Sequence, residues 1–215
     1  APIAEEMNPI KPGLLGGSYK PLSEKNVKKL YNLALDALAD IGLGLAPQSG
    51  INYMTNAGAQ FGDDGRVRFP KSLVEDMISL SSKDLTLFGR EERFDMHLSG
   101  KKVFFGTAGA AVHVVDVEKK EYRDSTAQDL FHAAQIIQEL DNIHFFQRVM
   151  VARDIADNFE MDLNTLYSCC GGTTKHVGTS FSEPNHVDAC LELLHTIAGG
   201  EEKWRARPFV SNSNC

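Results

Sequence analysis

Apolar side chains recur at helical spacing through the first third of the chain. After Ser23, a residue type that often caps a helix, they return every three or four residues as far as Ile41, and Gly42 then provides a stop. The same patterns predict the other elements of this region, a helix at about 47–57, a hairpin turning on Asp64-Gly65 and a helix at about 71–81. We therefore expect residues 23–82 to form a helical cap with one small hairpin.

From about residue 83 the pattern changes to short runs that alternate apolar and polar positions and end at glycine, which is typical of strands. One pair of runs flanks Glu118-Lys119-Lys120 and predicts a hairpin. Apolar strand candidates also begin at a nearly constant interval, near residues 112, 144, 176 and 209. Each interval of 32 or 33 residues contains a helical pattern, the first of which opens with a capping box formed by Ser125 and Gln128. Strand, helix and strand at this length are typical of a parallel sheet.

The length of this repeat favours an α/β fold of the (β/α)8 TIM-barrel type, which needs about 250 residues for eight units. A doubly wound open sheet has the same period, but no strand here is followed by the G-x-G-x-x-G motif of its dinucleotide-binding form. Three or four units are recognisable, so we expect residues 83–215 to supply a β-rich opening and the first units, roughly half of a barrel, in a piece of a longer protein. Residues 1–22, with four prolines, should form an extended arm.

Composition excludes several classes of function. Hydrophobic residues make up 42% of the chain and charged residues 24%, as in ordinary globular proteins. The net charge of -7, without a basic face, argues against a nucleic-acid partner. No apolar run reaches the roughly 18 residues that a membrane span needs, and the acidic, proline-rich start does not resemble a secretory signal. Because the four cysteines lack the spacing of a disulfide framework, we expect a cytoplasmic protein.

The stretch SCCGGTTKHVGTSFSEPNH, residues 168–186, contains candidate ligands for a metal or a phosphate. Cys169, Cys170 and His176 are metal-binding types, but adjacent residues on a helix point about 100° apart and the spacing is not that of a structural zinc site. A phosphate loop should open a helix, whereas Gly171-Gly172 closes one. Neither role is favoured by the pattern.

A third interpretation makes this stretch the joint between a helix and the next strand. The strand would run from Lys175 to Phe181, and Ser182 would be the N-cap of the helix that follows. In (β/α)8 barrels the chemistry lies at the C-terminal ends of the strands. The end of this strand, with Thr179 and Phe181, is therefore the place to look for a binding site, and the cysteines belong to the packing.

An ordered series of motifs resembles one known family. The motifs are GTAGAAVHVVD at 106–116, STAQDLFHAA at 125–134, LDNIHF at 140–145, the helix that leads into TTKHV, and LALDALADIGL near the N-terminus. Together they resemble the trimethylamine methyltransferase family of corrinoid-dependent methyltransferases. The resemblance covers about residues 25–215 and corresponds to the N-terminal half of such a protein.

The resemblance implies a (β/α)8 barrel that moves a methyl group from a methylated amine to the Co(I) corrinoid (cobalamin) of a separate carrier protein. Members that act on trimethylamine use pyrrolysine, in the half that is not present here, and several relatives without it act on quaternary amines such as glycine betaine. A quaternary nitrogen is already cationic and leaves as a neutral tertiary amine. The protein therefore mainly holds the cation, through aromatic faces and a carboxylate, and aligns the N–CH3 bond. No Ser-His-Asp or Cys-His constellation is needed, and none is recognisable.

Strand ends and resemblance together suggest six substrate-binding residues, namely Gln147, Arg148, Thr179, Phe181, Asn212 and Ser213. Arg148 would bind the carboxylate of a betaine, although a salt bridge to Asp154 or Glu160 is the alternative. Phe181 would form part of an aromatic cage or, alternatively, fill a layer of the barrel. The pattern suggests no catalytic residue and no metal ligand.

Two other functions stay open on the sequence alone. One is a non-catalytic module that binds a quaternary amine or a corrinoid protein, and the other is a metal-dependent TIM-barrel enzyme that uses Cys169, Cys170 and His176. Methyl transfer to a corrinoid carrier is the function we favour, with a homo-oligomeric assembly.

Overall fold

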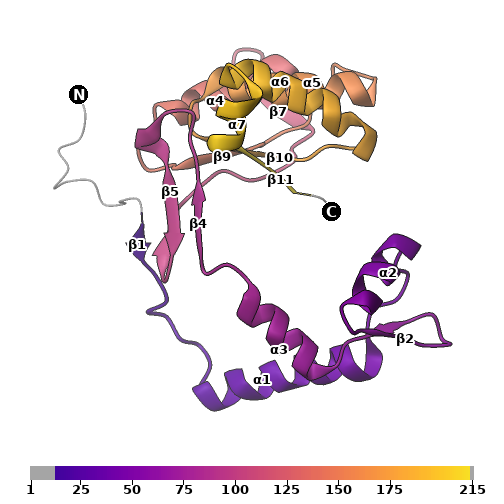
Figure 1. Cartoon of the computed structure of the whole chain (residues 1–215). Coiled ribbons are helices and arrows are strands. Elements are labelled where there is room, and N and C mark those ends of the chain that lie inside the picture. Colours follow the sequence, from indigo (N-terminus) through magenta and orange to yellow (C-terminus); the bar gives the residue numbers. More distant parts are fainter. Residues whose placement is uncertain (1–12, 214–215) are drawn as a thin grey trace. The chain divides into compact units, whose positions relative to one another are not determined.

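The computed structural model describes residues 13–213, which form two compact units (Figure 1). One unit contains residues 17–83, and the other combines residues 13–16 with 84–213. Residues 1–12, most of the predicted arm, lie outside the described residues. None of the helices within 13–213 combines the length and the apolar character that crossing a bilayer requires.

The unit of residues 17–83 has the elements that its apolar pattern predicts. In chain order they are α1 (Glu24–Asp36), a π-helical turn (Ala37–Ile41), α2 (Gln48–Asn56), β2 (Gln60–Phe61), β3 (Val67–Arg68) and α3 (Lys71–Leu80). Ser23 Oγ accepts a hydrogen bond from the N–H of Asn26 and caps α1. Gly42 adopts a φ of 70°, which ends the helix. A Cβ at Gly42 would also clash with the carbonyl of Val67.

The same unit has little buried apolar surface. Its buried apolar residues among those described are Leu35, Ala59 and Val67. Many larger apolar side chains are exposed, among them Leu30 and Ile78 at 54% and 46% of their surface. The predicted helices and hairpin are therefore present, but their apolar faces are only partly covered within the unit itself.

The other unit is built on a three-stranded parallel sheet in the order β11-β10-β9. Its strands are β9 (Phe145–Gln147), β10 (His176–Thr179) and β11 (Val210–Asn212). Helices α4 (Ala127–Gln138), α5 (Asn158–Gly172), α6 (Val187–Ala198) and the short α7 (Glu201–Ala206) connect or precede these strands. Strand β9, helix α5, strand β10, helices α6 and α7, and strand β11 follow one another, as the 32-residue repeat predicts.

Three antiparallel pairs complete this unit. They are β4 (Asp84–Leu87) with β5 (Met96–Ser99), β1 (Leu14–Leu15) with β6 (Lys102–Val103), and β7 (His113–Asp116) with β8 (Glu121–Asp124). The fold is mixed α/β. The sheet does not close into a barrel within the part of the chain that the structure describes.

The prediction of a barrel strand that begins near residue 112 is wrong. Strand β7 pairs with β8 in the hairpin that the sequence also suggested, and it is not part of the parallel sheet. The segment beside β9 is instead 106–111, through parallel bridges from Gly106 to Phe145 and from Ala111 to Met150. A Cβ at Gly106 would clash with the Phe145 ring, so the close approach requires a small residue. Glycine and alanine in this segment make no apolar pattern, which is why sequence reasoning passed over it.

Helices α4, α5 and α6 lie against one face of the parallel sheet (Figure 1). The core between them contains Leu130, Ala134, Phe146, Leu166, Cys169, Cys170, Val177, Cys190, Leu194 and Phe209. Phe146 and Val177 alternate with residues that point to the opposite face of the sheet, as strand geometry requires. The two adjacent cysteines belong to this core, in agreement with the interpretation from the sequence.

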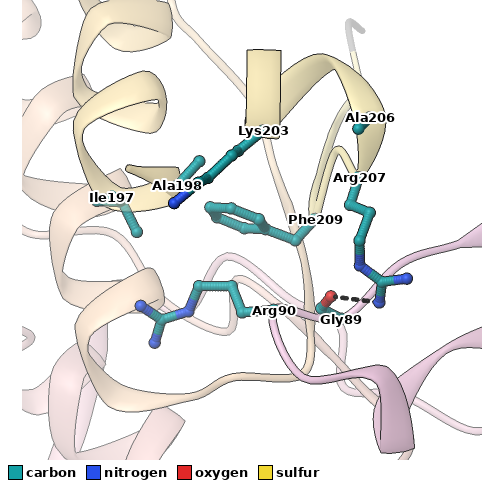
Figure 2. A pocket seen from close by; sticks show the side chains of 8 residues that line it. All are labelled: Gly89, Arg90, Ile197, Ala198, Lys203, Ala206, Arg207 and Phe209. Atoms are coloured by element: carbon teal, nitrogen blue, oxygen red, sulfur yellow. Dashed lines mark hydrogen bonds between the residues drawn. The ribbon is translucent and has the colours of Figure 1, made fainter. Parts of the chain in front are cut away.

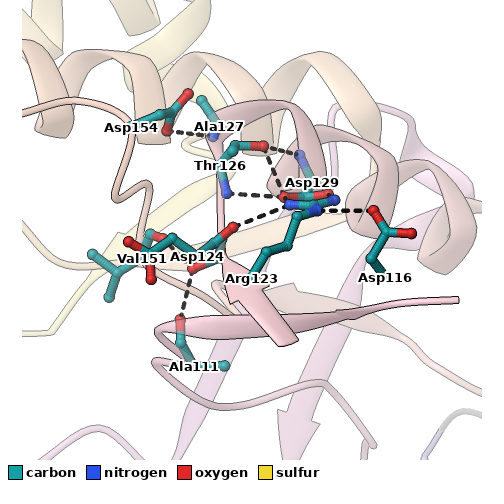
Figure 3. Close-up of polar contacts among 10 residues, drawn as sticks. Ala111, Asp116, Arg123, Asp124, Thr126, Ala127, Asp129, Val151 and Asp154 are labelled. Carbon is teal, nitrogen blue, oxygen red and sulfur yellow. Dashed lines mark hydrogen bonds and ion pairs between the residues drawn. The ribbon is translucent and has the colours of Figure 1, made fainter. Parts of the chain in front are cut away.

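The cap of α4 differs from the one expected. Thr126 and Asp129 form the capping box: Thr126 Oγ accepts from the N–H of Asp129, and the Asp129 carboxylate accepts from the N–H of Thr126 at 2.9 Å (Figure 3). Ser125, predicted to be the cap, is fully buried, and its hydroxyl donates to the carbonyl of Val151. The motif thus begins one residue later than predicted, because Ser125 is used to join the segment after β9.

Arg123 fastens the β7–β8 hairpin to the start of α4. Its guanidinium donates to both carboxylate oxygens of Asp129, at 2.6 and 2.7 Å, and more weakly to Asp116 (Figure 3). The hydrogen bond from Arg123 is the largest cause of an Asp129 pKa well below the usual aspartate range. On the other side of the helix start, Asp154 accepts from the N–H of Ala127. Side chains from strand β8 and from the loop after β9 therefore hold the first turn of α4.

The N-terminal ends of the parallel strands are closed by the segment between β4 and β5. His176 is hydrogen-bonded through Nδ1 to the carbonyl of Phe88 at 2.9 Å. Arg90 donates to the carbonyls of Cys170 and Thr173, the last turn of α5. Lys175, only 2% exposed, donates to three carbonyls at the end of α4 and beyond. This end of the sheet is tightly bonded, which leaves the C-terminal end as the open one.

Candidate functional site

A cavity of about 610 Å³ lies at the C-terminal ends of the parallel strands. Its walls come from the segments that follow β9, β10 and β11 and from the start of α6. The lining residues are Arg148, Ser180, Phe181, Ser182, Glu183, Pro184, Val187, Asn212 and Ser213. The position agrees with the general rule that ligands of parallel α/β sheets bind beyond the carboxyl ends of the strands.

Four of the six predicted substrate-binding residues line this cavity, namely Arg148, Phe181, Asn212 and Ser213. Thr179 does not: it is 1% exposed, on the same face of β10 as Val177, and lies among the core residues. Gln147 is also outside the lining. Their roles in binding stay predictions, but the structure brings four side chains from three strands to one place.

Gln147 extends along the opposite face of the sheet. Its backbone pairs with Gly178, and a Cβ at Gly178 would clash with its side-chain amide. Gly178 has no side chain and thereby leaves the space that this amide occupies. Thr107 donates from Oγ1 to the carbonyl of Gln147 at 2.6 Å and holds the strand end from the other side.

Arg148 brings a positive charge to the cavity. Among residues 13–213 its guanidinium has no hydrogen bond or ion pair, so the alternative of a bridge to Asp154 or Glu160 is not realised. Glu183, also without an ion pair in the described chain, brings a negative charge to the same lining. The cavity therefore presents a cation, an anion and the aromatic ring of Phe181. Such a set suits a small zwitterion.

The cavity wall rests on a buried polar group that sequence reasoning missed. Asp162 of α5, 4% exposed, accepts through Oδ2 from the N–H and the hydroxyl of Ser182, both at 2.8 Å. His186 is bonded to the same oxygen through Nδ1 at 2.8 Å, and its ring packs edge-on to Phe159. The available signal was an acidic residue on the apolar stripe of a helix, four positions before Leu166.

These residues also correct one prediction made from the sequence and bear on another. Ser182 is not a helix N-cap, because the 3-10 turn Pro184–His186 precedes α6 and Ser182 bonds to Asp162 instead. A serine, a histidine and an aspartate do come together, but not as a nucleophilic triad. Ser182 Oγ and His186 Nδ1 are 3.5 Å apart and both bond to the same Asp162 oxygen. The histidine therefore does not lie between serine and aspartate, as a proton-accepting base would.

The cysteines are poorly suited to bind a metal. Cys169 and Cys170 are 0% and 1% exposed, and burial raises the pKa of the Cys170 thiol to about 12 and that of Cys169 further still. Metal binding requires the thiolate, which this core disfavours. His176 already uses Nδ1 on a backbone carbonyl, and burial lowers its pKa. Their chemistry does not fit the metal-dependent alternative.

A second cavity, of about 310 Å³, lies at the N-terminal end of β11 (Figure 2). Phe209 forms its centre, packed edge-on against Trp204. Arg207 at its rim is paired with Asp95 at 2.7 Å and also donates to the carbonyl of Gly89, while Arg90 is bonded to the end of α5. Two of the three cations that line this cavity therefore serve the packing of the strand ends, and we place the candidate site in the larger cavity.

Comparison with known proteins agrees with the motifs. Residues 5–214 match the family model described as trimethylamine methyltransferase (MTTB). Among curated proteins, the chain is 27% identical over 194 residues to trimethylamine methyltransferase MttB of Desulfitobacterium hafniense, covering 90% of this chain and 39% of that protein. It is 24% identical to MttB of Methanosarcina barkeri and 23% identical to MttB1 of Methanosarcina mazei, each over 88% of this chain and 39% of the relative.

The chain thus spans about two fifths of the length of the curated relatives it matches. The match nevertheless covers nearly all of this sequence, including the strand ends that line the larger cavity. The chain belongs to the trimethylamine methyltransferase family.

Proposed function

We propose that the protein containing this chain transfers a methyl group from a quaternary amine, such as glycine betaine, to the Co(I) corrinoid of a separate carrier protein. We also propose that its parallel strands are part of a (β/α)8 barrel. Membership of the family supports methyl transfer from a methylated amine, and the relatives are named as trimethylamine methyltransferases. Cytoplasmic location and homo-oligomeric assembly stay predictions.

The residues of the larger cavity suit the binding part of this reaction. The carrier's corrinoid supplies the nucleophile that accepts the methyl group. The part of this chain is to hold the amine: Arg148 would bind a carboxylate, and Phe181 with Glu183 would face the ammonium group. The amine loses its charge as the methyl group departs. Contacts to the cation are therefore strongest in the bound substrate, and their loss should raise KM more than it lowers kcat.

The single observation that carries the proposal is that Arg148 and Glu183 line one cavity with Phe181, neither of them paired to another described residue. The complete protein, with a Co(I) corrinoid, should convert it to methyl-Co(III) on addition of glycine betaine. Release of the tertiary amine should match the methyl-cobalt formed. If no quaternary amine produces methyl-cobalt, the proposed reaction is wrong; amine binding without methyl transfer would favour the non-catalytic module.

Variants of the cavity test how the amine is held. Arg148→Gln should weaken binding of glycine betaine by about 1.5–3 kcal/mol, the usual value of a hydrogen bond to a charged group, and leave tetramethylammonium binding unchanged. Phe181→Ala should weaken the binding of both ligands by roughly 0.5–2 kcal/mol. Arg153→Gln is the matched control, because Arg153 is paired with Asp124 and does not line the cavity. Calorimetry on the complete protein measures all three.

A further inference from the structure

The loop between β10 and α6 supplies most of the wall of the candidate site. Five consecutive residues of this loop, 180–184, line the cavity. Two of them, Phe181 and Glu183, are those proposed to face the ammonium group. The loop has a single 3-10 turn and no strand partner of its own, so its position depends on bonds to neighbouring elements.

Two side chains from other elements hold this loop through consecutive backbone amides. Asn212, at the end of β11, accepts from the N–H of Phe181 at 3.1 Å. Asp162, in the second turn of α5, accepts from the N–H of Ser182 at 2.8 Å. The backbone between Phe181 and Glu183 is therefore tied to a strand on one side and to a helix on the other.

Asp162 makes the stronger of these attachments. Its Oδ2 atom receives three hydrogen bonds at 2.8 Å, from the amide and hydroxyl of Ser182 and from His186 at the far end of the loop. Asp162 and His186 are 4% and 7% exposed. A carboxylate is buried at a cost unless it is well bonded. Each of these hydrogen bonds comes from the loop, so the buried carboxylate fixes both ends of the segment 182–186.

We propose that Asp162 is a positioning residue of the amine site: it holds the β10–α6 loop in the conformation in which Phe181 and Glu183 face the bound cation. The proposal rests on the proposed function of the cavity. Asp162 does not line the cavity itself and acts through Ser182 and His186. A loop that is already ordered loses less conformational entropy when the ligand binds, which is how such a residue increases affinity.

The test compares Asp162→Ala and Asp162→Asn with Asn164→Ala in the complete protein. Asn164 is an exposed residue of the same helix, bonded only to the carbonyl of Glu160, and serves as the matched control. Hydrogen exchange of the peptide that contains residues 180–186 reports the order of the loop. Calorimetry with glycine betaine reports binding, and steady-state kinetics separate KM from kcat.

In Asp162→Ala we expect loop exchange to accelerate at least about tenfold and Kd and KM to rise about tenfold, as loss of hydrogen bonds to a charged acceptor predicts. kcat should stay within about twofold, since the contacts affected act on the bound cation. Asp162→Asn keeps an acceptor for the Ser182 amide and should recover part of both effects. A variant that had merely lost stability would not show a raised KM with an unchanged kcat, nor a partial recovery in Asp162→Asn.

Unchanged loop exchange in both Asp162 variants would overturn the proposal, and so would faster exchange with unchanged Kd. If Asp162→Ala does not fold, Asp162→Asn decides the question with smaller shifts in the same direction. Ser182→Ala, which removes the hydroxyl bond alone, is then read by loop exchange only, because Ser182 itself lines the cavity. Should the unsubstituted protein bind no amine, the proposed function fails, while the exchange data still decide whether Asp162 holds the loop.

Discussion

The hydroxyl of Thr179 has no hydrogen-bond partner in the described chain, although the residue is 1% exposed. A buried hydroxyl without a partner costs about 1–3 kcal/mol. Its position at the end of β10 suggested a substrate contact, but the side chain lies on the helix-facing side of the sheet and outside the cavity.

We therefore predict that Thr179→Val leaves amine binding unchanged and raises the free energy of unfolding by about 1 kcal/mol, because valine has the same shape without the hydroxyl. Urea denaturation and calorimetry measure the two quantities. If Thr179→Val weakens amine binding and leaves the free energy of unfolding unchanged, the prediction is wrong and the Thr179 hydroxyl contacts the ligand.

At the scale of single residues, the sequence was informative where the position of a residue along a strand decides whether it lines the cavity. Arg148, Phe181, Asn212 and Ser213 could be predicted to lie close together because they stand at the ends of strands of a parallel sheet, and they do line one cavity. Asp162 was not, because its importance comes from a partner 20 residues away, Ser182, and no local pattern records that contact. The unpaired state of Arg148 likewise depends on where the carboxylates of other elements lie.

At the scale of elements, the attachment of the β7–β8 hairpin to α4 is sensitive to pH. Arg123 holds the pKa of Asp129 well below that of an unfolded aspartate, near 3.9. In the folded protein this carboxylate stays charged at a pH where the unfolded chain takes up a proton. Its contribution to stability is therefore complete above about pH 4 and is lost as the pH falls further.

We predict that Asp129→Asn lowers the free energy of unfolding by about 1–3 kcal/mol at pH 7, since it removes the negative charge that pairs with Arg123 and leaves one acceptor oxygen where two are used. The difference from the unsubstituted protein should shrink as the pH falls from 4 to 3. Glu118→Gln, in the exposed hairpin turn, is the control and should have no effect. A difference that stays constant with pH would show that the charge of Asp129 contributes nothing.

The elements themselves were predictable where the apolar period is strong, as in α1, α4, α6 and the strands β9 to β11. The error near residue 112 has a physical cause. A half-exposed hairpin and a buried parallel strand both give short apolar runs, and the true neighbour of β9 is recognisable only by close approach of backbone at Gly106.

At the scale of the whole molecule, β11 has a bonded neighbour on one side only within residues 13–213. Open strand edges and large exposed apolar side chains favour association. We predict that residues 1–215 expressed alone form concentration-dependent oligomers or aggregates, and that supplying the rest of a full-length relative's sequence suppresses them. Sedimentation velocity over a range of concentrations makes the measurement; a single monomeric species with a cooperative melt would contradict it.

The contact between Gln147 and Gly178 limits which sequences this fold can accept during evolution. Nothing in the backbone forbids alanine at 178; only the amide of residue 147 stands in the way. The two positions should therefore vary together, with a larger residue at 178 tolerated where 147 is small. Because this amide is the far end of a flexible side chain, it can move aside, and we expect Gly178→Ala alone to destabilise the protein by only about 1 kcal/mol. The added change Gln147→Ala should restore part of that loss, as a double-mutant cycle would reveal. Strictly additive effects on the free energy of unfolding would mean that the two positions are not coupled and can vary independently.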